Sequence, residues 1–201
     1  MEAATKEEFR RKLQAEISLL NSTYPNNEII EYILSNYQEK LGEISVETFM
    51  AAYKAGNKHS GAIISMAMYL WEYEARFGFC LNVLSYILIS NGRIPNFKGK
   101  KGTKITELDE LESVLISNKC QFLSKNGFKM FALNNKQMEK FRNMRNSVAH
   151  YNLRIDKEGV ITKYNEKNQT WDKLPVIPVQ GDLMEFSTDF LSILWSFFFV
   201  T

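Results

Sequence analysis

Several kinds of residue are scarce in this chain of 201 residues, and each scarcity excludes a class of protein. Two cysteines are too few for a disulfide scaffold, and four prolines and ten glycines exclude a collagen-like or linker-dominated chain. The two histidines form no cluster with the cysteines at metal-ligand spacing. We therefore expect no metal site and no cofactor. Cys80 and Cys120 lie in apolar runs and are predicted to be buried thiols, with a disulfide between them as the alternative.

Long apolar runs and an excess of one charge sign are also missing. The longest apolar stretch, 190–200, is shorter than the roughly 20 residues that span a bilayer, and it contains Ser192 and Ser196. The charged N-terminus has no apolar core, which argues against a secretory signal. Lys and Arg exceed Asp and Glu by only 25 to 23, too little to predict a nucleic-acid partner. With 45% hydrophobic residues, the chain is expected to form one soluble, cytoplasmic domain without a membrane partner.

Helical periodicity dominates the first three quarters of the chain. Apolar residues recur four and three apart from about 60 to 90, which predicts a helix of nearly thirty residues. Thr5 and Glu8 form a capping-box pair that opens an earlier amphipathic helix. The apolar stripe of that earlier helix is Phe9, Leu13, Ile17 and Leu20. Further helices are predicted at about 29–37, 46–54, 106–117 and 135–149.

The pattern changes after His150. Residues 153–164 alternate with period two around Lys157-Glu158-Gly159, which predicts a β-hairpin. Residues 174–179 contain two prolines and are predicted to be an extended connector before an apolar helix at about 182–200. The fold class is therefore all-α, a helical bundle with a small β-hairpin inserted before its C-terminal helix. We divide this one domain into an N-terminal helical extension (1–58), a core (60–155), the hairpin (152–173) and the last helix (182–200).

Arg145, Asn146 and His150 are the candidate catalytic residues. Four residues separate the arginine from the histidine at the end of a predicted helix, so both side chains can reach one anion beyond it. Arginine supplies donors matched to phosphate oxygens, histidine exchanges a proton near neutral pH, and Asn146 can orient either one. Together they could cleave RNA without a metal, through attack of the ribose 2′-hydroxyl on the adjacent phosphate. The alternative is a helix C-terminus whose cations only favour the helix dipole.

The segment Arg145-Asn-Ser-Val-Ala-His150 resembles the signature of the HEPN superfamily (higher eukaryotes and prokaryotes nucleotide-binding). That signature is an arginine, four to six residues and then a histidine, often with a polar residue directly after the arginine. The resemblance covers the helical pattern of about 60–155 and the last helix. It implies an all-α HEPN-like bundle and a homodimer whose two motifs form one cleft for metal-independent RNA cleavage. Arg145 would stabilise the scissile phosphate, His150 would transfer a proton, and Asn146 would orient them.

The same resemblance bears on partners and regulation. Such proteins serve as toxins of toxin–antitoxin pairs, abortive-infection effectors against phage, or RNA-processing subunits. The expected partners are therefore RNA, a second copy of the chain, and an antitoxin or other regulatory protein. In one toxin subgroup, an antitoxin modifies a tyrosine two residues after the histidine. Here Tyr151 adjoins His150 and Asn152 takes that position, which argues against this route. The rival hypotheses are a non-catalytic HEPN-like module that binds RNA, nucleotide or a protein, and an unrelated bundle whose Arg145/His150 pair is structural.

Charged residues near the motif are further candidates. From 136 to 157 the cations exceed the carboxylates by four, which favours salt-sensitive binding of RNA. Arg142 is either a substrate-binding phosphate contact or an exposed helix cation. The lysine-rich loop at 98–104 either extends this surface or is only solvated. Glu74 borders the stripe of the long helix and is expected to reach solvent or a neighbouring arginine. The tryptophans are expected to pack rather than to stack on bases; they are Trp71, Trp171 and Trp195.

Overall fold

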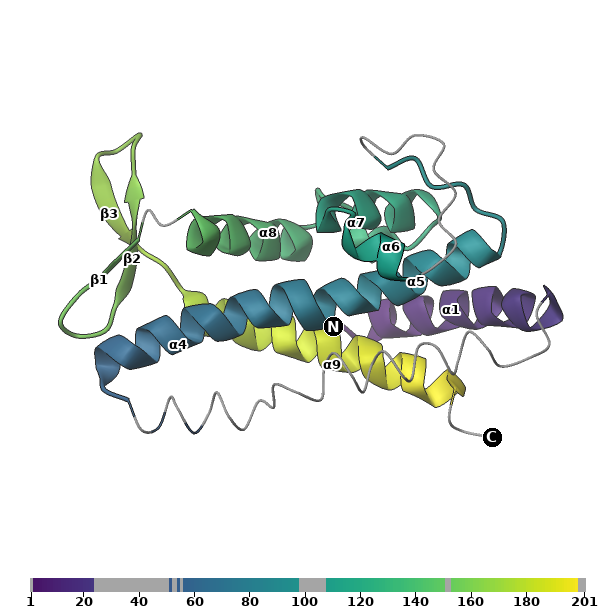
Figure 1. Ribbon diagram of the computed structural model, residues 1–201, viewed down its shortest axis with the longest axis horizontal. Helices are drawn as coiled ribbons and strands as arrows, with labels where there is room; N and C mark the ends of the chain where they lie inside the picture. Colours follow the sequence, from purple (N-terminus) through teal and green to yellow (C-terminus); the bar gives the residue numbers. More distant parts are fainter. Residues whose placement is uncertain are drawn as a thin grey trace.

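A computed structural model shows a mainly helical protein with a small antiparallel sheet before its last helix (Figure 1). The structure describes residues 2–23, 51, 54, 56–97, 108–150 and 153–198. In chain order the elements are α1 (Ala3–Thr23), α4 (Lys58–Trp71), the π-helical turn η1 (Glu72–Phe77), α5 (Gly78–Ser90), α6 (Leu108–Glu112), α7 (Ile116–Lys125), the 3-10 turn η2 (Lys129–Phe131), α8 (Lys136–Ala149), β1 (Leu153–Ile155), β2 (Ile161–Asn165), β3 (Thr170–Lys173) and α9 (Val176–Phe198).

One long rod, made of α4, η1 and α5, runs through the middle of the molecule (Figure 1). The long helix predicted at 60–90 is therefore confirmed. Its start is capped by the side chain of Asn57, which accepts a hydrogen bond of 2.9 Å from the N–H of Ser60. Within η1 the hydrogen bonds lengthen by one residue, so that the N–H of Gly78 reaches the carbonyl of Tyr73. Such π turns are uncommon in proteins, and those that occur often lie at functional sites. Residues 72–77 are therefore candidates for a functional site.

Aromatic side chains from five elements meet at the centre of the core. Phe77 of the rod contacts Phe131, Phe141 and Phe186 with ring centres 5.9–6.5 Å apart. The apolar stripe predicted for the first helix is buried, and the ring centre of its Phe9 lies 4.9 Å from that of Phe190 in α9. Helix α1 therefore packs in the same core as α5 and α9. The predicted buried thiols are confirmed as well, and the alternative of a disulfide is wrong, because both cysteines are buried and free.

Two helix boundaries differ from the prediction. The helix expected at 106–117 is broken: α6 ends at Glu112, and a second helix, α7, begins at Ile116. The prediction of an extended connector at 174–179 is wrong for Val176 onward, because α9 begins there rather than near 182. Pro178 lies in the first turn of α9, where the missing N–H of a proline costs no hydrogen bond. A proline there is thus compatible with a helix start.

The sheet contains one strand more than the predicted hairpin. Strands β1 and β2 are confirmed as an antiparallel pair, and β3 pairs with the other edge of β2, with Tyr164 opposite Trp171. All four residues of β3 are exposed. The strand therefore has no buried face, and the alternation of buried and exposed positions that identifies a strand from sequence does not apply to it. Trp171 packs against Tyr164 and beneath the Arg154 guanidinium, although 42% of it stays exposed. Lys163 ties the sheet to α8 by a hydrogen bond of 3.1 Å to the Ser147 hydroxyl.

Some predictions concern segments outside the described residues. These are the helix at 29–37, most of the helix at 46–54, the loop at 98–104, the residues Tyr151 and Asn152, and the side chain of Trp195. Among the helices that the structure does describe, none is long and apolar enough to cross a membrane.

Candidate anion-binding and catalytic site

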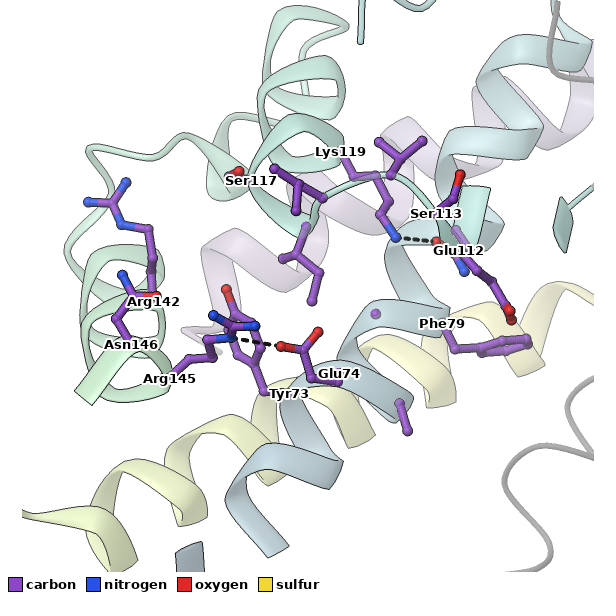
Figure 2. Close-up of a pocket in the computed structure, with 16 residues that line it drawn as sticks. Tyr73, Glu74, Phe79, Glu112, Ser113, Ser117, Lys119, Arg142, Arg145 and Asn146 are labelled. Carbon is purple, nitrogen blue, oxygen red and sulfur yellow. Dashed lines mark hydrogen bonds and ion pairs between the residues drawn. The ribbon is translucent and has the colours of Figure 1, made fainter. Parts of the chain in front are cut away.

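Helix α8 borders a cavity of about 690 Å³ (Figure 2). One wall comes from η1 and α5, a second from the α6–α7 connection and the start of α7, and the third from α8. The volume lies in the range of small-molecule and cofactor sites. Its charged lining residues are Glu74, Glu112, Lys119, Arg142 and Arg145, so that three cations face two carboxylates.

The position of α8 follows from its amphipathic sequence and two anchors. Met138, Phe141, Met144 and Val148 are buried, which turns the opposite face toward the cavity. At the start of the helix, Asn135 caps the first turn by accepting hydrogen bonds from two backbone N–H groups. Halfway along the helix, the Tyr69 hydroxyl donates a hydrogen bond of 2.6 Å to the Phe141 carbonyl and so fixes α8 to α4.

The structure brings three of the four candidate residues to this cavity. Arg142, Arg145 and Asn146 line it together, and Arg142 is half-buried rather than an exposed helix cation. His150 does not line it: it caps the end of α8, where its N–H donates to the Asn146 carbonyl at 3.2 Å and its side chain is exposed. The two halves of the motif therefore face different surroundings.

Arg145 is held by a carboxylate from the rod. Its Nε atom lies 2.8 Å from Oε1 of Glu74, as Figure 2 shows, so the expectation that Glu74 reaches a neighbouring arginine is confirmed. The side chains of Arg145 and Glu74 are 38% and 48% exposed. An ion pair this accessible contributes at most about 1 kcal/mol. A phosphate can therefore replace the carboxylate at little cost.

The same π turn carries a second carboxylate that points the opposite way. Glu72 is 1% exposed and pairs at 3.1 Å with Arg76, which also donates to the Thr188 hydroxyl of α9. Burial raises the pKa of Glu72, although the charge of Arg76 works against that shift. Its Oε1 atom has no hydrogen-bond partner among the described residues. This pair belongs to the core and takes no part in the cavity.

Lys119 is the site residue that sequence reasoning missed. It lies in α7, is only 3% exposed, and donates a hydrogen bond of 2.7 Å to Oδ1 of Asn82. Burial lowers the pKa of Lys119 to about 8, while Cys120 and the carboxylates of Glu112 and Glu74 oppose the shift. The sequence gives no sign of this burial, because it depends on an asparagine 37 residues away.

One cation of the basic stretch 136–157 is used within the fold, since Lys140 forms an ion pair with Asp182 of α9. Lys163 of β2, outside that stretch, donates a hydrogen bond to the Ser147 hydroxyl. Within the described segments, no group of three or more His, Cys, Asp or Glu side chains could hold a metal ion. The polar groups that line the cavity are cations, two carboxylates, amides and hydroxyls.

Comparison of the chain with models of known protein families, with curated proteins and with solved structures finds no match. The class that fold and site define is a mainly helical protein with a cationic cavity beside an Arg-Asn-x-x-x-His motif. The features that bear on function are therefore this motif and the cavity beside it.

Proposed function

We propose that the protein is a metal-independent endoribonuclease of the HEPN type. The observation that carries the proposal is the placement of Arg145 and Asn146 on an accessible face of α8, with His150 exposed at the end of the same helix. Arg145 is already held in position by Glu74, in a pair that a phosphate can enter. The likeness of the motif to that of HEPN proteins supplies the reaction, and its place in toxin–antitoxin or anti-phage defence rests on that likeness alone.

The proposed reaction uses each motif residue in one role. His150 takes the proton of a ribose 2′-hydroxyl, whose oxygen then attacks the adjacent phosphate. Arg145 donates to the non-bridging oxygens, which gain negative charge in the transition state, and Asn146 orients the guanidinium. The bond to the 5′-oxygen breaks, which leaves a 2′,3′-cyclic phosphate and a 5′-hydroxyl once that oxygen is protonated. One chain supplies a single His150, so a homodimer is part of the proposal: the second His150 is the acid.

The test is cleavage of RNA in EDTA by the wild type, Arg145→Ala and His150→Ala, with analysis of the product ends. His59→Ala is the matched control, because His59 is the other histidine of the chain and is exposed at the start of α4. We expect cyclic phosphate ends from the wild type and the control and at least a hundredfold loss in the two motif variants. Light scattering measures the dimer. Activity that survives both motif substitutions would refute the proposal.

The second candidate function is a non-catalytic module that binds RNA, and one observation favours it. His150 is absent from the cavity that Arg142 and Arg145 line, so anion binding and proton transfer are spatially separate in one chain. This alternative predicts salt-sensitive RNA binding that Arg145→Ala weakens and His150→Ala leaves unchanged, without cleavage of any RNA. A filter-binding assay on the same variants separates the two functions.

A further inference from the structure

The cavity contains a buried ammonium group that forms no ion pair with any described carboxylate, although Glu74 and Glu112 line the same cavity. Lys119 is 3% exposed, and the one hydrogen bond that its ammonium forms with the described residues goes to the neutral amide oxygen of Asn82. Glu74 is engaged with Arg145, and among the described residues no carboxylate forms an ion pair with Lys119. Burying a charge without a counter-charge costs stability, and proteins normally pair or neutralise such groups. A buried ammonium group without an ion-pair partner among the described residues points to an anionic ligand.

The surroundings of Lys119 suit a phosphate. Arg142 and Arg145 line the same cavity, so an anion there meets three cations against the two carboxylates of Glu74 and Glu112. The cavity also contains the first turn of α7, where the N–H groups of Ile116 and Ser117 make no backbone hydrogen bond to the described residues and the helix dipole favours negative charge. A phosphate presents several acceptor oxygens and so satisfies such a set of donors better than a single carboxylate does.

The remaining walls suit a nucleoside. Phe79, Val114, Leu115 and Ile116 give the cavity apolar surface, and Leu115 is 67% exposed at its rim. The hydroxyl of Ser117 and the amide of Asn146 add hydrogen-bonding groups. Figure 2 shows the side chain of Lys119 on α7 and that of Arg145 on α8. The cavity therefore has a cation on each of these two helices.

We propose that this cavity is a binding site for a nucleoside phosphate, in which Lys119 binds the phosphate group. As a subsite for the nucleotide next to the cleaved bond of RNA, it rests on the proposed function. A free mononucleotide has the same chemistry, and the arms of the experiment below separate the two sources. Lys119 is a binding residue that neither the motif nor its spacing includes.

Binding has a signature that a structural lysine lacks. Burial lowers the pKa of Lys119 to about 8 in the free protein, against the opposing effects of Cys120, Glu112 and Glu74. An anion beside the ammonium favours its charged form, so ligand binding near pH 8 takes up a proton. Calorimetry in buffers of different ionisation enthalpy measures that uptake.

The experiment compares the wild type, Lys119→Met and Lys125→Met by isothermal titration calorimetry at low salt. Lys125 is the matched control, since it is an exposed lysine of the same helix. The probes are adenosine 5′-monophosphate and a 2′-O-methyl RNA oligonucleotide, which lacks the attacking hydroxyl and is not cleaved. We expect Lys119→Met to bind at least tenfold more weakly and to lose the proton uptake, while Lys125→Met binds like the wild type. Thermal unfolding verifies that Lys119→Met is folded.

The outcomes distinguish this inference from the proposed function. Equal binding by Lys119→Met and the wild type, or binding of neither probe by the wild type, overturns the inference, even if RNA is cleaved. Binding of the oligonucleotide that depends on Lys119, without cleavage of ordinary RNA, supports the inference and refutes the nuclease. Tighter binding of the mononucleotide than of the oligonucleotide assigns the site to a free nucleotide. The reverse order assigns it to RNA.

Discussion

Glu72 and Glu74 lie two residues apart on one π turn and yet end in opposite environments. Positions two apart on a helix face away from each other, so one carboxylate enters the core and the other enters the cavity. Glu72 is buried and bonded to an arginine of its own helix, whereas Glu74 is half exposed and bonded to an arginine of another helix. The two ion pairs have distances of 3.1 and 2.8 Å. Burial, rather than distance, separates a structural pair from an exchangeable one.

The two pairs should differ most in the free energy of unfolding that is lost when the arginine of each pair is replaced by alanine. Arg76→Ala leaves Glu72 as a buried charge without a partner, which we expect to cost about 3–5 kcal/mol of unfolding free energy. Arg145→Ala leaves Glu74 free to solvent, and we expect a cost within about 1 kcal/mol. Urea denaturation measures both. Equal losses in the two variants would mean that burial does not set the difference.

A third charge, on Lys119, extends the comparison to a buried group that forms no ion pair with the described residues. Its pKa falls to about 8 in the folded protein, so its charge destabilises the fold below that pH. As the pH rises from about 8 to 10.5, the folded state loses the proton first and this cost disappears. The wild type should therefore gain on the order of 3 kcal/mol over Lys119→Met across that range. Urea denaturation of both proteins at pH 7.5 and pH 10.5 is the test, and a constant difference would contradict it.

The contribution of Glu72 to the free energy of unfolding should become more favourable as the pH falls, whereas that of Lys119 should become more favourable as the pH rises. Because burial raises the pKa of Glu72, the folded state holds the proton more tightly than the unfolded state, and the ionised form costs stability at neutral pH. That cost is relieved as the pH falls through the raised pKa toward 4.5, the ordinary value. We expect the wild type to gain stability relative to Glu72→Gln over this interval. Melting temperatures of the two proteins at each pH are the test. If Glu72→Gln gained stability relative to the wild type as the pH fell, the predicted direction would be wrong.

Glu74→Gln should have the smallest effect on stability and a clear effect on RNA. The exposed pair contributes at most about 1 kcal/mol, so the melting temperature should hardly change. Without the competing carboxylate, Arg145 is available to phosphate, and the Kd for RNA should fall about threefold at low salt. Glu139→Gln is the control, since it removes the same charge from an exposed position of α8. An equal change in both variants would mean that net charge, rather than the pair, is responsible.

The predictions from sequence hold where local periodicity decides the structure. The stripes of α1 and of the long rod are confirmed, because a repeat of three and four residues requires nothing from the rest of the chain. Helix α7 and strand β3 were missed for the opposite reason. The break before Ile116 lies inside an otherwise helical pattern, and the wholly exposed β3 depends on hydrogen bonds from β2.

The site divides in the same way. The grouping of Arg142, Arg145 and Asn146 follows from positions on one helix and could be predicted, as could an arginine partner for Glu74. The π turn and the burial of Lys119 could not. A lysine is rarely buried, and here its position depends on Asn82 of a helix that the sequence does not connect with α7.

The contact between α1 and α9 has a consequence for the nascent chain. Lys6 binds Asp189 at 2.8 Å across 183 residues of sequence, and Phe9 packs on Phe190. At ~5–20 residues per second, the ribosome needs roughly ten to forty seconds to make the chain between them. During that interval α1 can pack against α5, but the part of its apolar side that α9 covers lacks that partner and offers a chaperone a binding segment. Docking of α9 against α1 and α4 is therefore expected to be the last step of folding, and it can follow only after translation of the C-terminal helix.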